Sequence, residues 1–196
     1  MACIKAWVDL MKTEEPKKPR RAGSGKSKGS SFERTICGKL SLWLSRGLRD
    51  DLLWRSAMSG GRATVRHKRG LVVRSQHGDI SAIQPEGDPL TRRFFIECKA
   101  YSKINFHGLY STNEKPLAGI AYFWVKAVEE SAKYNLCPML IAKENNFPPV
   151  VLLNWDGIVF FELEEFYYGE FLHLGGAAVY LVYLDHFLQH ARRPRG

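Results

Sequence analysis

The stretch GDISAIQPEGDPLTRRFFIECK, residues 78–99, decides the expected fold of this chain. Its last seven residues, 93–99, have the pattern of a strand, in which successive side chains point to opposite faces of a sheet. One face of this strand is apolar enough to join a core, and it carries Phe94, Ile96 and Cys98. The other face places a carboxylate beside an ammonium group, at Glu97 and Lys99.

The same stretch predicts an antiparallel β-hairpin. The run DISAI, residues 79–83, would be the partner strand, and PEGDP, residues 85–89, supplies residues that are typical of turns. This pairing would bring Asp79 near the end of the strand that holds Glu97 and Lys99. Two carboxylates and a lysine at one sheet edge suit a divalent metal ion and a phosphate.

Size and charge limit the class of protein. With 196 residues the chain is long enough for one domain with a proper core, and its hydrophobic fraction of 45% predicts that most of it is globular. The formal net charge of +9 indicates a polyanionic partner, nucleic acid before membrane.

Cysteines and apolar runs indicate the compartment. The four cysteines show no CxxC pair and no nearby histidine at zinc spacing, so we expect reduced, mostly buried thiols in an intracellular protein; they are Cys3, Cys37, Cys98 and Cys137. Lys5 and Asp9 interrupt the N-terminus, which is therefore not a secretory signal. The longest apolar run, 174–184, is too short to span a bilayer. We expect a soluble, cytoplasmic protein with no membrane partner.

The N-terminal segment differs in composition from the remainder. Residues 12–31 are rich in Lys, Arg, Pro, Gly and Ser, which predicts disorder. The segment is either an arm that grips phosphates or a solubilising linker. We therefore divide the chain into a flexible basic arm, 1–30, and a single domain, 31–196, with a core at 31–155 and a C-terminal extension at 156–196.

The first helix is expected from Ser30 or Ser31 to a C-cap near Gly47. Glu33 begins its apolar stripe, and two interpretations of this carboxylate stay open. It could be a further ligand of the metal site. It could also close a capping box with Ser30 as N-cap.

The segments around residues 78–99 supply candidate DNA contacts. DLLWRSA, residues 51–57, is expected to be the first strand. The basic loop 62–74 either contacts DNA or is a solvated surface, and its candidate contacts are Arg62, Arg66, Lys68 and Arg69. His67 and His77 could be metal ligands or general bases, although loop histidines are more often neither. After Lys99, an aromatic and basic loop could touch distorted DNA or pack over the hairpin, through Tyr101, Lys103, Phe106, His107 and Tyr110.

Further elements are expected downstream. A long amphipathic helix should run from 116 or 117 to 134, with strands at 139–142 and 150–153. The C-terminal part reads as a strand at 158–163, a short helix at 164–171 and a terminal helix at 179–191. Its aromatic residues either form a subunit interface or, more commonly, close the core. Its acidic residues are expected to be solvated: Glu162, Glu164, Glu165 and Glu170.

The order of these features resembles the PD-(D/E)XK nuclease superfamily, and within it archaeal-type Holliday junction resolvases and related phage-encoded nucleases. The resemblance covers about residues 30–143 and rests on four short motifs: Phe32-Glu33-Arg34, Trp54-Arg55-Ser56 followed by Ser59-Gly60, Gly78-Asp79-Ile80, and Phe95-Ile96-Glu97-Cys98-Lys99. The chain departs from the resolvases at Gly78, where they usually have proline. It departs again in its long basic loop and beyond Asn154, where no counterpart is found.

The resemblance implies an α/β, restriction-endonuclease-like core with a mixed sheet flanked by helices. It also implies DNA cleavage that depends on Mg²⁺, for which Mn²⁺ can substitute, in a prokaryotic or phage-infected cell. The implied catalytic set is Glu33, Asp79, Glu97 and Lys99, with metal ligands at Asp79, Glu97, the backbone carbonyl of Cys98, and Glu33. Arg55 and Ser59 would lie near the phosphate.

The favoured hypothesis is thus a metal-dependent, structure-selective DNA endonuclease without a small-molecule cofactor. Junction resolution needs two opposed cuts, so that version implies a C2 homodimer. One alternative is a nuclease for linear, nicked or flapped DNA in phage replication or packaging. Another is a nucleic-acid-binding protein with this fold and no turnover.

Overall fold

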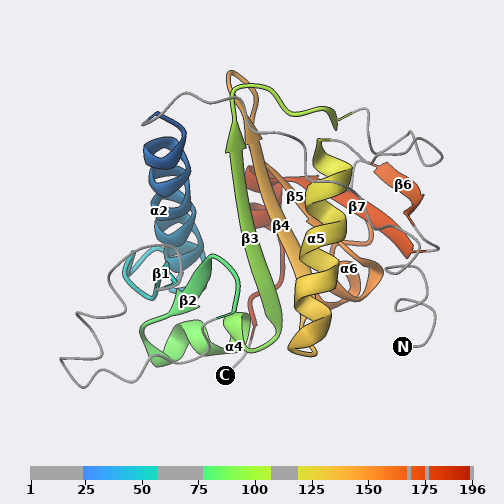
Figure 1. Cartoon of the computed structure of the whole chain (residues 1–196). Coiled ribbons are helices and arrows are strands. Elements are labelled where there is room, and N and C mark those ends of the chain that lie inside the picture. The colour runs from blue at the N-terminus through green and yellow to red at the C-terminus, as the bar shows by residue number, and fades with distance from the viewer. Residues whose placement is uncertain (1–23, 57–76, 107–118, 167–168, 175–176, 195–196) are drawn as a thin grey trace.

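The computed structural model describes residues 24–56, 77–106, 119–166, 169–174 and 177–194 (Figure 1). Side chains are described for residues 29–56, 77–106, 119–166 and 178–194. The expected arm up to residue 23 and the basic loop 62–74 therefore lie outside the described residues.

A five-stranded mixed sheet forms the centre of the described chain, in the order β3-β4-β5-β7-β6. Its strands are β3 (Phe94–Tyr101), β4 (Cys137–Glu144), β5 (Val150–Leu153), β6 (Gly169–Leu174) and β7 (Ala177–Tyr183). β3 and β4 are parallel and the other pairs are antiparallel. The helix α5 (Ile120–Lys133) connects the parallel pair, as such a crossover requires.

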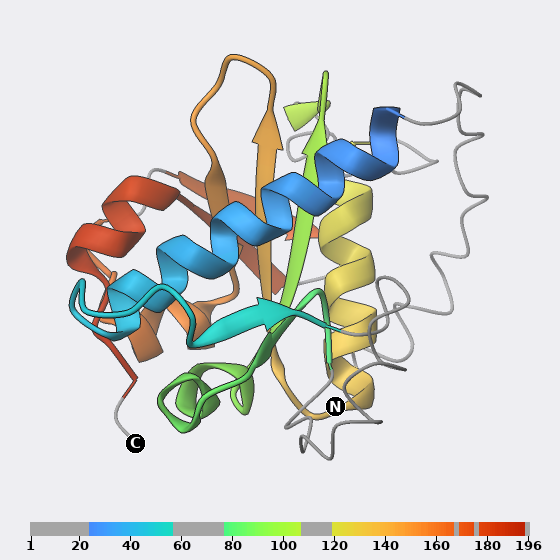
Figure 2. The same ribbon diagram turned by 90° about the vertical axis from the view of Figure 1, so that its left-hand side faces the viewer.

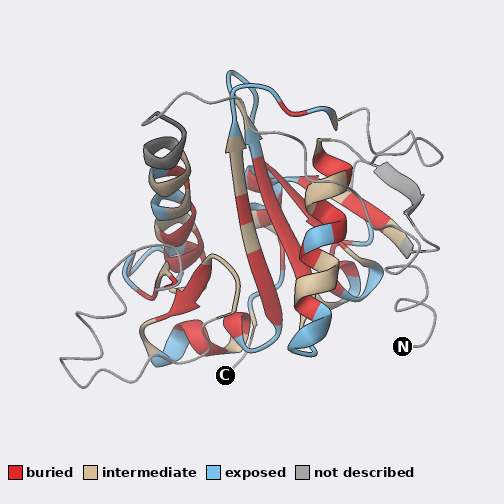
Figure 3. Ribbon diagram, viewed as in Figure 1, coloured by how far each residue is buried: buried red, intermediate tan, exposed pale blue. Residues whose placement is uncertain are grey.

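Helices cover both faces of this sheet. One apolar cluster joins the sheet to α2 (Ser24–Leu44), α6 (Trp155–Phe161) and α7 (Leu184–His190). A second cluster joins the opposite face to α5. In Figure 2, α2 crosses in front of the strands and α5 lies behind them, and Figure 3 shows the buried residues along both seams. This arrangement confirms the predicted α/β, restriction-endonuclease-like fold.

The predicted hairpin is wrong. β2 (Ile80–Ala82) pairs antiparallel with β1 (Leu53–Arg55), in a two-stranded sheet of its own. Between β2 and β3 the chain forms a 3-10 turn, η2 (Pro85–Gly87), and a short helix, α4 (Asp88–Thr91). Each of these begins with a proline in its first turn, where the fixed φ of proline favours a helix start. The residues taken for a tight turn are thus two helical turns.

The first helix begins earlier than predicted. α2 starts at Ser24, so Ser30 lies inside the helix, and residues 24–30, expected to belong to the flexible arm 1–30, are helical instead. The capping box with Ser30 as N-cap is therefore wrong. The predicted end is close, because α2 stops at Leu44 and Gly47, with φ +86°, donates its N–H to the Leu42 carbonyl (2.7 Å).

Three C-terminal assignments are also wrong. The expected strand 158–163 overlaps α6, whose start is capped by the Asn154 side chain accepting from the Gly157 N–H (3.0 Å). The expected helix 164–171 runs into β6. The expected terminal helix is β7 followed by α7, because the apolar run AAVYLVY pairs with β5 and β6.

Several downstream expectations agree with the described structure. α5, β4 and β5 occur as predicted, and the stripe of α5 that includes Ile120, Trp124 and Ala127 is buried. Phe161 is fully buried, which supports the core explanation of the C-terminal aromatics. Cys37 and Cys98 are buried free thiols and Cys137 is partly buried. Among the described residues, the structure contains no helix both long and apolar enough to cross a membrane.

Residues 156–194 are packed into the same unit as residues 31–155. β7 lies between β5 and β6, so it is an interior strand of the sheet. Side chains of α6 and α7 belong to the same apolar cluster as those of α2 and β3.

Candidate active site

Asp79 is attached to the outer edge of β3. Its backbone N–H donates to the Ile96 carbonyl (2.8 Å), and its carboxylate oxygen Oδ2 accepts from the Cys98 N–H (2.8 Å). Gly78 and Ile96 form an isolated parallel bridge. Asp79 therefore meets β3 without the hairpin that the sequence suggested.

Gly78 makes this attachment possible. Its φ is +78°, a conformation that side chains rarely adopt. A Cβ at this position would lie 2.5 Å from the Ile96 carbonyl oxygen. Proline, with its φ fixed near −65°, cannot take this conformation. The departure from the resolvase pattern at this position thus has a local geometric cause.

The end of β1 holds the Gly78–Asp79 segment from the other side. The Ser56 backbone N–H donates to the Asp79 carbonyl (2.9 Å). The Ser56 hydroxyl donates to the Gly78 carbonyl. Ser56 is buried, so these bonds fix the backbone that carries the Asp79 carboxylate.

Glu97 and Lys99 form an ion pair on one face of β3. Their side chains are 22% and 25% exposed, so the pair is largely shielded and still reachable from solvent. Burial raises the pKa of the Glu97 carboxyl, as do the charge of Asp79 and a hydrogen bond with it, whereas Lys99 lowers it; the net shift is upward. Burial lowers the pKa of Lys99, but the charges of Glu97 and Asp79 outweigh it and the net shift is upward.

These groups fit a hard divalent cation. The charge of Asp79 is close enough to raise the pKa of the Glu97 carboxyl, an arrangement that a cation between the two carboxylates would relieve. In a strand, the N–H and C=O of one residue point to the same side. Because the Cys98 N–H points to Asp79, the Cys98 carbonyl also faces this edge. Mg²⁺ commonly uses one or two carboxylates and keeps several waters, so this donor set suits it.

Glu33 is placed differently. Its carboxylate forms an ion pair with Arg55, whose Nη1 also donates to the Ser30 hydroxyl (2.8 Å). The Glu33 side chain is 13% exposed and that of Arg55 is 21% exposed. Over the described ranges, no three side chains of His, Cys, Asp or Glu gather into a group that could hold a metal ion. The structure thus brings Asp79, Glu97 and Lys99 together, and it pairs Glu33 with Arg55.

Two buried thiols lie within electrostatic reach of these charges. Burial, helped by the Glu33 charge, raises the pKa of Cys37 to about 12. Burial and the charge of Asp79 raise the pKa of Cys98 as well. In the metal-free chain both thiols therefore stay protonated at neutral pH, and the Cys98 side chain lies on the buried face of β3, opposite Glu97 and Lys99.

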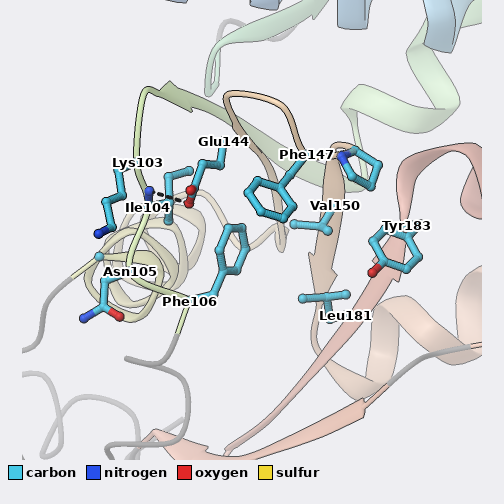
Figure 4. A pocket seen from close by; sticks show the side chains of 11 residues that line it. Lys103, Ile104, Asn105, Phe106, Glu144, Phe147, Val150, Leu181 and Tyr183 are labelled. Carbon is cyan, nitrogen blue, oxygen red and sulfur yellow. Dashed lines mark hydrogen bonds between the residues drawn. The ribbon is translucent and has the colours of Figure 1, made fainter.

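Of the expected DNA contacts, Arg55, Tyr101, Lys103 and Phe106 lie within the described residues, whereas His107 and Tyr110 do not. Ser59, Arg62, Arg66, Lys68, Arg69 and His67 lie outside the described residues. Lys103 is exposed just beyond β3, at the rim of a cavity of about 950 Å³ (Figure 4). The described lining of this cavity is mainly apolar, and Glu144 closes one side by accepting from the Ile104 N–H (2.8 Å). Asp79, Glu97 and Lys99 do not line it.

Sequence reasoning missed an aromatic partner of the site. The His77 ring stacks on Tyr134, with centroids 3.9 Å apart, rather than joining a metal cluster. Tyr134 follows α5, far along the chain, and its ring also lies parallel to that of Phe95. The alternation of the sequence already places Phe95 on the face of Glu97. The contact of Phe95 with Tyr134, which follows α5, depends on tertiary packing.

Comparison with known proteins identifies the family of this chain. The family model described as "Phage putative PDDEXK endonuclease" matches residues 24–169, which include α2, Asp79 and the Glu97-Cys98-Lys99 segment. No curated protein and no solved structure gives a significant match. The closeness to archaeal resolvases stays a prediction. Because the family model covers most of the chain, this chain belongs to the phage PDDEXK endonuclease family.

Proposed function

We propose that this protein is a metal-dependent endonuclease that hydrolyses phosphodiester bonds in DNA. The observation that carries the proposal is the meeting of Asp79, Glu97 and Lys99 at the edge of β3. Family membership agrees with a nuclease, and the net charge of +9 suits a polyanionic substrate.

The carboxylates of Asp79 and Glu97 and the Cys98 carbonyl would hold the cation, with Mg²⁺ as the expected ion and Mn²⁺ as a substitute. When bound, it supplies positive charge that activates water and polarises the phosphate. Asp79 is held ready for this role, because one of its carboxylate oxygens already accepts from the Cys98 N–H. This hydrogen bond also fixes the orientation of the second carboxylate oxygen of Asp79.

Lys99 acts as a cation in this scheme. The charges of Glu97 and Asp79 raise its pKa, so the ammonium group of the metal-free chain is charged at neutral pH. It holds the attacking water or stabilises the negative charge that develops on the phosphate. Glu33 is proposed as a further carboxylate that completes or enlarges the metal site, and Arg55 as a group near the phosphate; the two form an ion pair beside the end of β1.

Substitution of Glu97 or Lys99 by alanine tests this proposal. We expect each variant to lose cleavage by about 100-fold or more, because each removes a group that touches the cation or the phosphate. DNA binding should persist in both. Glu165→Ala and Lys39→Ala are matched controls, since both residues lie outside the site, and they should cleave normally. Full activity of Glu97→Ala or Lys99→Ala would remove the site assignment.

Substrate structure and assembly are proposed on the resemblance. Branched DNA cut by a homodimer is the first candidate, and linear, nicked or flapped DNA in a phage-infected cell is the second. Cleavage of a panel of junction, flap, single-stranded and duplex DNAs with Mg²⁺, together with sedimentation of the protein, separates them. A binding protein without turnover would instead bind DNA in a salt-sensitive way and nick none of these substrates.

A further inference from the structure

Aromatic side chains occupy both ends of the β3 face that carries the acid–lysine pair. Alternate residues of a strand share a face, so Phe95, Glu97, Lys99 and Tyr101 lie in one row. Glu97 and Lys99 are in the middle of this row. The first and last positions are aromatic.

At the beginning of the row, three rings are stacked. Phe95 and Tyr134 are nearly parallel, at 7°, with centroids 6.4 Å apart. Tyr134 in turn stacks on His77, with centroids 3.9 Å apart. His77 is two residues from Asp79, and Phe95 is two residues from Glu97. We call these three rings the Tyr134 stack.

At the end of the row, Tyr101 stacks on Phe123 of α5, with centroids 5.2 Å apart and an interplanar angle of 14°. We call this pair the Tyr101 stack. Lys103, exposed two residues further on, adds a positive charge beside it. Phe95 and Tyr101 are six residues apart, so the two stacks are separated by about 20 Å along the strand.

Packing between β3 and α5 does not by itself explain these rings. Core aromatics of this chain, such as Phe94, Phe161 and Phe187, are fully buried. Tyr101 is 47% exposed and Tyr134 is 46% exposed, although each belongs to a stack; Phe95 is buried, so in the Tyr134 stack it supports the exposed Tyr134 ring from below. Exposed, pre-stacked rings next to a phosphate site are the surface on which unpaired bases stack, because every base has a flat face and paired bases have theirs covered.

We propose that the two stacks receive unpaired bases on either side of the phosphate that is cut. The inference rests on the proposed nuclease function and narrows its substrate to DNA with a few unpaired nucleotides at the cut, such as a single strand or a flap. A continuous duplex, or a junction with all bases paired, would leave both stacks empty.

Binding measurements test the stacks without turnover. In the full-length chain with Glu97→Gln and no metal, we would measure the affinity for a fluorescent single-stranded oligonucleotide and for the duplex of the same sequence. Tyr101→Ala and Tyr134→Ala should each weaken single-strand binding about tenfold or more, and duplex binding much less. Tyr101→Phe and Tyr134→Phe keep the ring and should bind like the parent. Trp155→Ala removes an exposed aromatic on α6 and should have no effect.

A second readout reports stacking directly. An oligonucleotide with 2-aminopurine beside the cut position should lose fluorescence when bound, and the alanine variants should restore it. Circular dichroism and a melting curve check that each variant is folded.

The two proposals can fail separately. If the active chain with Mg²⁺ or Mn²⁺ cuts no substrate, the nuclease function fails, while the oligonucleotide affinities still test the stacks. If it cuts duplex or paired junctions at least as fast as single-stranded and flapped DNA, the nuclease stands and the stacking proposal is overturned. Equal weakening of single-strand and duplex binding by the alanine variants would also overturn it.

Discussion

Two opposing influences act on the carboxyl group of Glu97. Burial and the nearby Asp79 charge raise its pKa, whereas Lys99 lowers it, and the net pKa lies above the ordinary 4.5. The folded chain therefore holds this proton more tightly than the unfolded chain does. By linkage, this carboxyl contributes stability at acidic pH, and that contribution is lost as the pH rises through the folded-state pKa. A bound cation would instead favour the ionised form of the Glu97 carboxylate, because only that form binds the cation.

The affinity for Mg²⁺ should accordingly fall with decreasing pH, and the fall should begin above pH 4.5 because the pKa of Glu97 is raised. Protons and the cation compete for the same oxygen atoms. Titration calorimetry with Mg²⁺ between pH 5 and 8 measures this dependence. Glu97→Gln, which carries no titrating group, should bind weakly and with a flatter profile. An affinity that stays constant down to pH 5 would contradict the assignment.

Gly78 offers a test of the attachment of Asp79 to β3. Gly78→Ala should destabilise the fold by about 1–3 kcal/mol, because alanine is strained at a positive φ, and Gly78→Pro by more. Cleavage should fall as well, since Asp79 moves with the backbone. Gly38, inside α2, is the matched control: a Cβ there meets nothing within 4 Å, so Gly38→Ala should stabilise by up to about 1 kcal/mol.

Urea denaturation gives both differences in the free energy of unfolding. A Gly78→Pro variant as stable and active as the parent would show that the close approach to Ile96 is dispensable.

At the scale of elements, the strand of the candidate site was predictable from sequence and its neighbours were not. The alternation of Phe94 to Lys99 predicts β3 and the face of Glu97, since one face is buried in the core. The hairpin failed because PEGDP contains turn residues that also start helices, and propensity alone does not choose between the two. In the C-terminal part, helices of seven residues are too short to show a 3.6-residue period. β7, interior to the sheet and largely apolar, shows no clear alternation.

The candidate site was predictable to a similar extent. Asp79, Glu97 and Lys99 belong to recognisable motifs, and they meet although the connection between them was misjudged. The ion pair of Glu33 and Arg55 joins α2 to β1. The stacking of His77 on Tyr134 joins the end of α5 to the edge of β3. Such contacts are set by how elements pack in space, and no local pattern in one sequence encodes them.

The Glu33–Arg55 ion pair should couple α2 to β1. Both side chains are mostly buried, so removing one leaves the other charge poorly solvated, and Glu33→Gln or Arg55→Met should each destabilise by about 1–3 kcal/mol. The double variant should lose less than the sum of the two. A double-mutant cycle on unfolding free energies measures this coupling. Strictly additive losses would show that the two residues act independently.

On the scale of the whole molecule, the C-terminal part completes the sheet and the core. Side chains from this part are fully buried: Ile158, Phe161, Leu163, Val182, Leu184 and Phe187. A chain shortened to residues 1–155 would lose them together with β7, which lies between β5 and β6. We expect the shortened chain to lack cooperative thermal unfolding.

A single substitution gives a graded version of the same test. Phe187→Ala should destabilise the full chain by about 3–5 kcal/mol, because it leaves a cavity in the buried core. Gln189→Ala, on the exposed side of the same helix, should change stability by less than about 0.5 kcal/mol. Calorimetry on the shortened chain and both variants measures the effects. Native-like cooperative melting of the shortened chain would mean that residues 156–196 are an appendage.

Within the described chain, β3 is one of the two edge strands of its sheet, a position at which unpaired backbone groups can recruit a strand from another molecule. Gly78 and Asp79 cover part of that border by bonding Ile96 and Cys98. Asp79 would thus protect this edge against strand addition whether or not it takes part in catalysis. An aspartate at this position in an inactive relative would therefore not be evidence of nuclease activity.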